Sequence, residues 1–420
     1  MRKLVTRLPK SFQDVATLIF GNGFAALFPI VLAPLLTRLY TEQEFGIYTT
    51  FLAVVMLFAS FSTGRFDLAI LESRTKNVAI HLVILSTLLT ICISLISLVI
   101  ISSIQVLFPQ LENISDLGYL VYLIPISILL ISLVQITTHV LNREKMFKQM
   151  TTSKIIRTSF GSVLQVGYGY WKFSFYGLVL GKLIGDTMNV IYSVSIIVRE
   201  KIFSNEKIHL NRIKYVANKY NKYFKINSLH SFLNVSTTSS IPLLLGFFFD
   251  NSVVGFYGLS FSVCFLPVTL ISQAVFQIFS REFSIRLDDG KEIFTYFKST
   301  VLRLILTSAP IFIVLILFGD ILFETIFGVD WSTSGRFAQI LAPYLFSTFV
   351  VSPFAFVALR LNKHAHIFRV ELVNIFLRIG SITVGSIYYN EFIALAFFSF
   401  SGIAVNIYLI IWVFNQLKRK

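Results

Sequence analysis

The chain has 420 residues, of which 55% are apolar and only 14% are charged. A soluble domain carries about 25% charged residues, so this composition excludes a soluble enzyme. Lys and Arg nevertheless outnumber Asp and Glu by 36 to 21, and the mean hydropathy is +0.76. The positions of these cations are therefore the most informative feature of the sequence.

Long apolar segments recur along the whole chain. A membrane span needs about 20 apolar residues, and continuous runs such as 82–101 and 301–318 are too long for strands. The segments predicted to span the membrane are 14–37, 44–70, 78–106, 118–141, 155–170, 174–197, 224–249, 253–279, 299–318, 337–359, 367–387 and 392–414. They predict an all-α polytopic membrane protein with 12 transmembrane helices.

The charge of the loops alternates along this topology. The N-terminal and C-terminal tails and every second loop hold 27 of the 36 cations, namely residues 1–10, 71–77, 142–154, 198–223, 280–298, 360–369 and 415–420. The opposite loops hold only Arg38, Lys172 and Arg336, together with nine acids. Because cytoplasmic loops are enriched in Lys and Arg, both termini are predicted to be cytoplasmic.

The longest polar break divides the chain into six spans and six. We predict an N-terminal six-helix bundle at 1–197, a basic cytoplasmic connector at 198–223 and a C-terminal six-helix bundle at 224–420. The connector also contains three tyrosines, a combination found in nucleic-acid-binding segments, but its place in a membrane protein favours contact with anionic headgroups, and no nucleic-acid partner is expected. A short repeat supports the division, since Pro-Leu-Leu followed by Gly-x-Tyr occurs near residue 34 and again near residue 242.

Motifs for enzymatic chemistry are missing from the sequence. It contains no phosphate-binding loop, no H-E-x-x-H, no C-x-x-C and no G-x-S-x-G. Cys92 and Cys264 lie in apolar runs, and the His364–His366 pair has no neighbouring acids, so no metal or cofactor is expected. The predicted outer loops are too small for a catalytic fold. We therefore expect a protein that is not an enzyme.

Ten ionisable residues remain within or beside the predicted spans. They are Arg65, Arg157, Lys182, Lys225, Arg303, Arg378, Asp14, Asp67, Asp186 and Glu371. A charge near the membrane centre costs at least ~2.5–3.5 kcal/mol, so it faces a partner or a cavity. The spans also contain the amides Asn22, Gln165, Asn189, Asn234, Gln273, Gln277 and Asn374. These amides are expected to bind neighbouring helices or to line a cavity.

Spacing suggests partners for some of these charges. Lys182 and Asp186 are four residues apart and could neutralise each other on one helix face. Glu371 and Arg378 are too far apart to pair directly, and Arg378 has no obvious local partner. We interpret three cations near the cytoplasmic surface as reaching lipid headgroups, namely Arg157, Lys225 and Arg303. If they face inward instead, they form a cationic inner vestibule. Arg65 and Asp67, two residues apart, are expected to point to different sides of one helix.

Several short motifs resemble one family of transporters. They are Pro-Leu-Leu-Thr-Arg-Leu-Tyr at 34–40, Glu-Phe-Gly-Ile-Tyr at 44–48, Val-Gly-Phe-Tyr at 254–257, Ile-Phe-Gly at 326–328 with Trp331, Ala338 and Ile-Leu-Ala at 340–342, and Asn-Lys at 362–363. This pattern resembles Wzx-type polysaccharide-repeat flippases of the multidrug/oligosaccharidyl-lipid/polysaccharide (MOP) exporter superfamily. One departure is the Ser-Thr-Thr-Ser-Ser run at 236–240, where relatives often have an acidic residue.

The resemblance implies a MATE-like fold and a flippase for undecaprenyl-diphosphate-linked oligosaccharides. It implies a multi-pass protein of the bacterial cytoplasmic (inner) membrane that acts in O-antigen and lipopolysaccharide biosynthesis, with membrane lipids and other polysaccharide-assembly proteins as partners. The residues predicted to bind diphosphate or sugar are Arg378, Arg65, Lys182, Arg303, Asn22, Asn234 and Asn374. Asp186 and Glu371 are the candidates for binding a coupling proton or sodium ion.

Two alternatives stay open at this point. A multidrug/cation antiporter of the same superfamily would have mostly cationic substrates, and its cavity should be acidic. A membrane glycosyltransferase or polymerase would need catalytic groups on the outer face. The six intramembrane cations exceed the four acids, which favours an anionic substrate.

Overall fold

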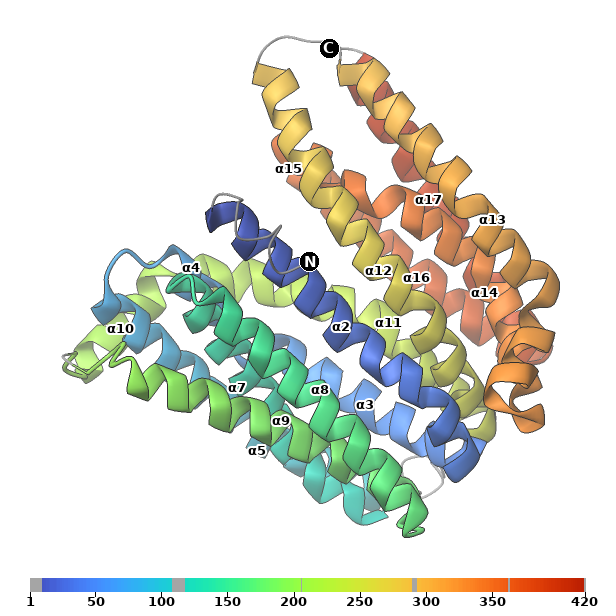
Figure 1. The fold of residues 1–420 in the computed structure, drawn as a ribbon, viewed down its shortest axis with the longest axis horizontal. Coiled ribbons are helices and arrows are strands. Elements are labelled where there is room, and N and C mark those ends of the chain that lie inside the picture. The colour runs from blue at the N-terminus through green and yellow to red at the C-terminus, as the bar shows by residue number, and fades with distance from the viewer. Residues whose placement is uncertain (1–9, 108–117, 205, 289–292, 362, 419–420) are drawn as a thin grey trace. The chain divides into compact units, whose positions relative to one another are not determined.

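The computed structural model describes residues 10–107, 118–204, 206–288, 293–361 and 363–418. For residues 10–20, 22, 105, 288, 355, 359, 364 and 365 it describes the backbone alone. These residues form helices throughout, and the described part of the chain contains no strand (Figure 1). The prediction of an all-α protein is confirmed.

The chain divides into two compact units, Met1–Ser239 and Ser240–Lys420. The first contains α2 (Lys10–Leu39), α3 (Glu42–Ser62), α4 (Phe66–Glu72), α5 (Lys76–Leu107), η1 (Gly118–Tyr122), α7 (Leu123–Arg143), α8 (Phe147–Tyr170), α9 (Ser174–Arg199), α10 (Leu210–Lys219), η2 (Tyr223–Asn227) and the start of α11 (Ser228–Phe248). The second contains the rest of α11, α12 (Asn251–Asp288), α13 (Ile293–Phe327), η3 (Val329–Trp331), α14 (Ser332–Val351), η4 (Ser352–Phe354), α15 (Ala355–Arg360), α16 (His364–Tyr388) and α17 (Glu391–Lys418).

The boundary between the units falls within α11, beyond the basic connector. Aromatic contacts explain this position. Phe224 stacks on Phe66 with ring centroids 6.3 Å apart, and Phe232 meets Phe61 at 5.5 Å. The π-helix η2 and the first turns of α11 are therefore packed into the first unit.

Nine helices of the described residues are long and apolar enough to cross a membrane. They cover Glu42–Ser62, Lys76–Ile104, Gly118–Arg143, Tyr223–Phe248, Asn251–Leu287, Ile293–Phe327, Val329–Ala358, His366–Tyr388 and Glu391–Lys418. Each matches one predicted span. The described apolar part of α2, Gly23–Leu39, is shorter, and α8 and α9 carry more polar side chains. The count of 12 and the cytoplasmic termini stay predictions.

Glycines allow α8 and α9 to lie unusually close together in the first unit. Gly177, Gly181 and Gly185 recur every fourth residue and so share one face of α9. A Cβ at Gly185 would lie only 2.5 Å from the carbonyl oxygen of Arg157, and one at Gly181 only 2.8 Å from the backbone nitrogen of Gln165. The backbones therefore touch, and short side chains on one helix reach the other. On its opposite side α8 packs along α2 (Figure 1).

The second predicted span is interrupted just after Ser62. Gly64 has a φ of 60° and Arg65 a φ of 55°, so two consecutive residues adopt the left-handed conformation and α4 starts in a new direction. A non-glycine residue pays about 1–2 kcal/mol for this conformation. The expectation that Arg65 and Asp67 lie on one continuous helix is wrong, because the break separates α3 from α4.

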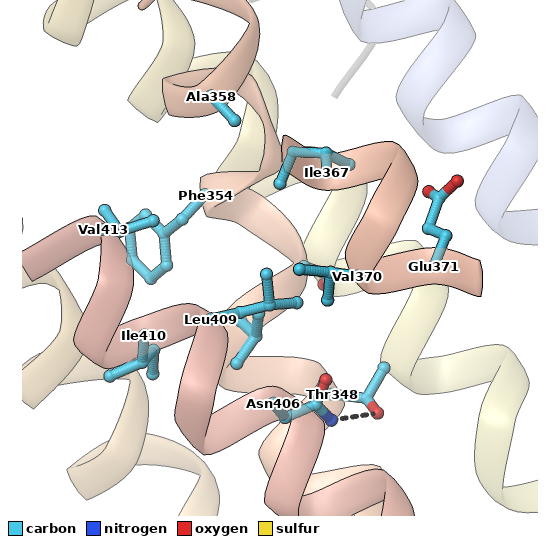
Figure 2. Close-up of a pocket in the computed structure, with 12 residues that line it drawn as sticks. Thr348, Phe354, Ala358, Ile367, Val370, Glu371, Asn406, Leu409, Ile410 and Val413 are labelled. Carbon is cyan, nitrogen blue, oxygen red and sulfur yellow. Dashed lines mark hydrogen bonds between the residues drawn. The ribbon is translucent and has the colours of Figure 1, made fainter. Parts of the chain in front are cut away.

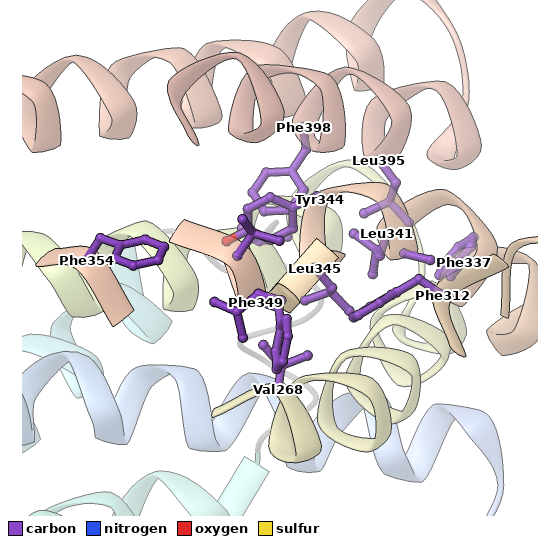
Figure 3. Packing of buried hydrophobic residues seen from close by; sticks show 14 of the residues in the cluster. Val268, Phe312, Phe337, Leu341, Tyr344, Leu345, Phe349, Phe354, Leu395 and Phe398 are labelled. Atoms are coloured by element: carbon purple, nitrogen blue, oxygen red, sulfur yellow. The ribbon is translucent and has the colours of Figure 1, made fainter. Parts of the chain in front are cut away.

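The second unit is organised around α14, which packs against α12, α13 and α17. The α14 side chains Phe337, Leu341 and Leu345 are fully buried and meet Leu395 and Phe398 of α17 (Figure 3). Continuous aromatic and aliphatic packing of this kind fixes the backbone of α14. It thereby positions the polar side chains on the adjacent turns of this helix.

Candidate functional site

One carboxylate in the first unit binds two cations. Asp186 of α9 is 1% exposed, and its Oδ2 accepts a hydrogen bond of 3.1 Å from Nζ of Lys182. Its Oδ1 accepts from Nε of Arg157 on α8. The predicted ion pair within α9 is thus present. The interpretation of Arg157 as a headgroup contact is wrong, because the glycine-mediated approach of the helices brings this side chain to Asp186.

The electrostatics of this group, which we call the Asp186 triad, are unbalanced. Two cations share one carboxylate, which leaves one excess positive charge. The side chains of Arg157 and Lys182 are 29% and 20% exposed, whereas that of Asp186 is 2% exposed. The cations are thus the accessible part of the triad. An anion could bind them without displacing the carboxylate.

Polar groups continue from the triad along the α8–α9 interface. Nε2 of Gln165 donates a 2.8 Å hydrogen bond to the carbonyl oxygen of Leu178. The carbonyl oxygen of Gln165 accepts from the Tyr40 hydroxyl at 2.7 Å. Burial, and then the nearby charge of Glu44, raise the pKa of Tyr40, so its hydroxyl remains a donor. These bonds tie the C-terminal end of α2 to α8 and link α8 to α9, the two helices that carry the triad.

A second buried carboxylate lies beside the break between α3 and α4. Asp67 is fully buried, accepts a 2.6 Å hydrogen bond from the Thr63 hydroxyl and lies 3.2 Å from Nε2 of His139 on α7. The backbone N–H of Arg65 donates to the same Thr63 hydroxyl at 3.2 Å. We call Thr63, Arg65, Asp67 and His139 the Asp67 cluster. It joins the helix break to α7, so the charge of Arg65 is held close to a carboxylate.

Arg378 in the second unit is enclosed by its own partners. It is 5% exposed, its Nε donates to Oδ1 of Asn374 at 2.9 Å, and its Nη2 donates to the Tyr344 hydroxyl at 2.8 Å. The guanidinium carbon lies 4.6 Å from the ring centroid of Tyr344 and 5.0 Å from that of Phe398. Tyr344 and Phe398 are drawn in Figure 3. The expectation that Arg378 lacks a local partner is therefore wrong, although it correctly identified a buried cation.

Glu371 lines a cavity of about 210 Å³ in the second unit, among helices α14 to α17. Figure 2 shows Glu371 at one side of the cavity and Asn406 with Thr348 at another, while most of the wall is aliphatic. Nδ2 of Asn406 donates to the hydroxyls of Ser347 and Thr348 at 2.9 and 3.1 Å. Arg378 hydrogen-bonds to Asn374 and Tyr344, whereas Glu371, two turns earlier on the same helix, lines this cavity.

The remaining predicted site residues do not join these groups. Arg303 lies on an exposed face of α13, with Leu302 and Leu306 also exposed. Asn234 is exposed on α11. The side chain of Asn22 lies outside the described residues. The candidate site residues therefore fall into the Asp186 triad and the Asp67 cluster of the first unit, and into the Arg378 contacts and the Glu371 cavity of the second unit.

Sequence reasoning missed several members of these groups. His139 and Tyr344 were not singled out, because neither belongs to a recognisable motif. Asn406 was absent from the list of intramembrane amides, although it lies in a predicted span. The glycines at every fourth position of α9 could have predicted that another helix packs closely against it. That close packing brings Arg157 of α8 to Asp186.

A family model described as polysaccharide biosynthesis protein matches residues 35–336. No curated protein matches the sequence. Solved structures that share the fold include several that are 12–14% identical to this chain.

Three of these structures illustrate the fold. Lipid II flippase MurJ in an inward closed conformation is 14% identical, has a TM-score of 0.72, and the match covers 95% of this chain and 89% of that chain. An inward-facing multidrug resistance MATE family transporter of the MOP superfamily is 12% identical with a TM-score of 0.63, covering 94% and 96%. A MOP superfamily transporter from Pyrococcus furiosus, also 12% identical, has a TM-score of 0.59 and covers 99% of both chains.

Proposed function

Because the chain belongs to the family of polysaccharide biosynthesis proteins, we propose that it is a flippase for a lipid-linked oligosaccharide. The family match over residues 35–336 carries this proposal. The fold shared with a protein described as a lipid II flippase supports it. The proposed substrate is an oligosaccharide repeat unit on undecaprenyl diphosphate, which moves from the cytoplasmic to the outer leaflet of a bacterial inner membrane.

The chemistry of such a substrate explains why a protein is needed. Each sugar hydroxyl that enters hydrocarbon without a partner costs several kcal/mol. A polar passage that opens to one side of the membrane at a time removes much of this cost. An inside-negative potential favours outward movement of the diphosphate by ~2.3 kcal/mol per charge per 100 mV. The protein must therefore supply cations and amides along the path.

We assign the first contact with the diphosphate to the Asp186 triad. Lys182 supplies the excess charge, and Arg157 presents a guanidinium that can bind phosphate oxygens in pairs. Arg65, a member of the Asp67 cluster, is the second proposed contact. Arg378 can serve only in a conformation that releases it from Tyr344, because its guanidinium is enclosed here. Arg303, Asn22, Asn234 and Asn374 remain proposed contacts for the diphosphate or the sugars.

Other parts of the proposal follow from the substrate. A coupling proton or sodium ion would bind at Asp186 or at Glu371, whose cavity also contains the amide of Asn406. The products would be repeat units for O-antigen or another surface polysaccharide. Partners would include membrane lipids and the proteins that assemble the polysaccharide.

Replacement of Lys182 tests this site without leaving a buried charge unpaired. Lys182→Met removes the excess cation and keeps the pair between Arg157 and Asp186. In cells that depend on this protein for surface polysaccharide, we expect Lys182→Met to lower polysaccharide about tenfold or more at unchanged protein level. Lys182→Arg keeps the charge and should retain most of the polysaccharide. Equal polysaccharide in both variants would contradict the assignment of the site.

The alternatives predict different results in the same cells. A cation exporter would leave polysaccharide intact when the gene is deleted and would change resistance to cationic compounds. A glycosyltransferase or polymerase would transfer sugars in detergent solution, where no sealed membrane exists. The flippase proposal predicts loss of surface polysaccharide with the lipid-linked repeat units retained on the cytoplasmic side.

A further inference from the structure

The short helix α10 lies outside the groups described above and has an unusual surface. Val216 is 1% exposed and packs among Ala79, Leu82 and Val140 of the first unit. On the remaining surface of α10, Leu210 is 82% exposed and Tyr215 is 56% exposed. Exposed cations lie between and beside them, namely Lys207, Arg212, Lys214 and Lys219. A helix with both apolar and cationic exposed side chains is typical of the interface between membrane and water.

A cavity of about 430 Å³ lies between α10 and the first turns of α5. Its lining consists of Asn77, Val78 and His81 on α5 and Arg212, Tyr215, Val216 and Lys219 on α10. None of these described lining residues is acidic, and two are cations. The volume is sufficient for a phosphate with a glycerol group, since small-molecule sites measure about 300–1,000 Å³.

Hydrogen bonds hold the cationic wall of this cavity in place. Nη1 of Arg212 donates to Oδ1 of Asn77 at 2.6 Å, and Nδ2 of Asn77 donates to Oε2 of Glu206 at 2.7 Å. The buried His81 fixes the chain just before α10, because its Nε2 accepts a 3.1 Å hydrogen bond from the backbone N–H of His209. Arg212 is thus oriented before any ligand arrives, which lowers the entropy cost of binding an anion.

We infer that this cavity binds the headgroup of an anionic phospholipid, with Arg212 and Lys219 on its phosphate. The exposed Leu210 and Tyr215 beside the cavity fit the hydrocarbon attached to such a phosphate, which a soluble anion would lack. The connector belongs to the loops that hold most of the cations and are predicted to face the cytoplasmic leaflet. Its charge complements the anionic lipids there. The inference goes beyond the proposed flippase function and does not depend on it.

Binding can be measured on the purified full chain by native mass spectrometry with added phosphatidylglycerol or phosphatidylcholine. The test variant is Arg212→Gln with Lys219→Gln, and the matched control is Lys207→Gln with Lys214→Gln, which removes two connector cations that do not line the cavity. We expect the test variant to lose about 30-fold in affinity for one phosphatidylglycerol, since each cation near an anionic surface contributes a factor of about five. The control should keep that binding step.

Three results would overturn the inference. Equal losses of affinity in the two double variants would mean that the connector attracts the lipid diffusely. Equal binding of phosphatidylcholine would mean that the cavity does not select for charge. Displacement of the lipid by inorganic phosphate would mean that the cavity binds a soluble anion. A second readout does not require the cations to be removed. In Tyr215→Trp, we expect phosphatidylglycerol with brominated chains to quench the tryptophan more strongly than brominated phosphatidylcholine does, and equal quenching would contradict the proposal.

Discussion

Nζ of Lys182 lies 3.1 Å from Oδ2 of Asp186, and Arg157 from the neighbouring helix contacts the other oxygen of the same carboxylate. One buried acid therefore binds two cations, one from its own helix and one from the neighbouring helix. The buried carboxylate offsets the repulsion between its two cationic partners, and its removal would leave both cations without a counter-charge. The energetic roles of the three residues are consequently unequal.

We predict that Asp186→Ala destabilises the protein far more than Lys182→Met does. Removing the acid leaves Arg157 and Lys182 close together without a counter-charge, at a cost of about 3–5 kcal/mol. Removing the lysine leaves a balanced pair and should cost under about 1 kcal/mol. Thermal unfolding of the purified variants compares the two. Equal melting temperatures would contradict the triad geometry.

Glycine at position 185 is predicted to be required for the contact between α8 and α9. In Gly185→Val the new side chain would meet the backbone of α8, where a Cβ already falls 2.5 Å from the carbonyl oxygen of Arg157. We expect a loss of about 1–3 kcal/mol or more, together with separation of Arg157 from Asp186. Gly167→Val on α8 is the matched control, because nothing lies within 4 Å of a Cβ at that position. A control that is as unstable as Gly185→Val would refute the packing argument.

Arg65 offers a way to separate charge from backbone strain. Its φ of 55° suits glycine, so Arg65→Gly should relieve about 1 kcal/mol of backbone strain at the break between α3 and α4. Loss of the attraction between the Arg65 charge and Asp67 offsets part of this gain. Arg65→Ala keeps the strain and loses the same charge, so it should be the less stable of the two. If Arg65 binds the diphosphate, both variants lose polysaccharide assembly to the same extent despite their different melting temperatures. Full activity in Arg65→Gly would remove Arg65 from the proposed site.

The contact between His139 and Asp67 should appear as an energetic coupling. We predict that His139→Gln and Asp67→Asn each destabilise the protein and that the double variant loses less than the sum, by about 0.5–3 kcal/mol. The reason is that both single changes break the same 3.2 Å contact. Chemical or thermal unfolding of the four proteins gives the cycle. Strict additivity would show that the two residues do not interact.

Tyr344 tests whether the surroundings of Arg378 are structural. Tyr344→Phe removes the hydroxyl that accepts from Nη2 and keeps the ring beneath the guanidinium. We expect a loss of about 1 kcal/mol in stability, the value of one hydrogen bond. Arg378→Met should lose more, since it also removes the bond to Asn374. A variant Arg378→Met with unchanged stability and no transport would instead indicate a role in binding substrate alone.

Much of the fold could be predicted from the sequence because long apolar runs have few alternatives to membrane helices. The family match over residues 35–336 confirms that the chain belongs to the polysaccharide biosynthesis proteins, and the fold is shared with a MATE family transporter and with MurJ. The prediction of one continuous second span failed at Gly64 and Arg65, since two left-handed residues interrupt the helix there and no apolar periodicity signals them.

The site was only partly predictable for a different physical reason. The pair of Lys182 and Asp186 lies on a single helix, where spacing alone gives the geometry. Arg157 and His139 approach their carboxylates from other helices, and such contacts depend on which helices pack together. Arg378 was recognised as a buried cation, but its partner Tyr344 lies 34 residues away in sequence. Spacing along one helix carries no information about a partner of that kind.

Reconstitution of the purified protein into vesicles tests directly whether it moves a lipid-linked oligosaccharide across a bilayer. Purified protein in sealed vesicles is given a lipid-diphosphate oligosaccharide, and a sugar-specific enzyme added outside measures the fraction that becomes accessible. We expect the accessible fraction to rise from about half to nearly all of the substrate with the wild-type protein and with Lys182→Arg, but to remain near half with Lys182→Met. No rise with the wild-type protein would contradict the proposed function.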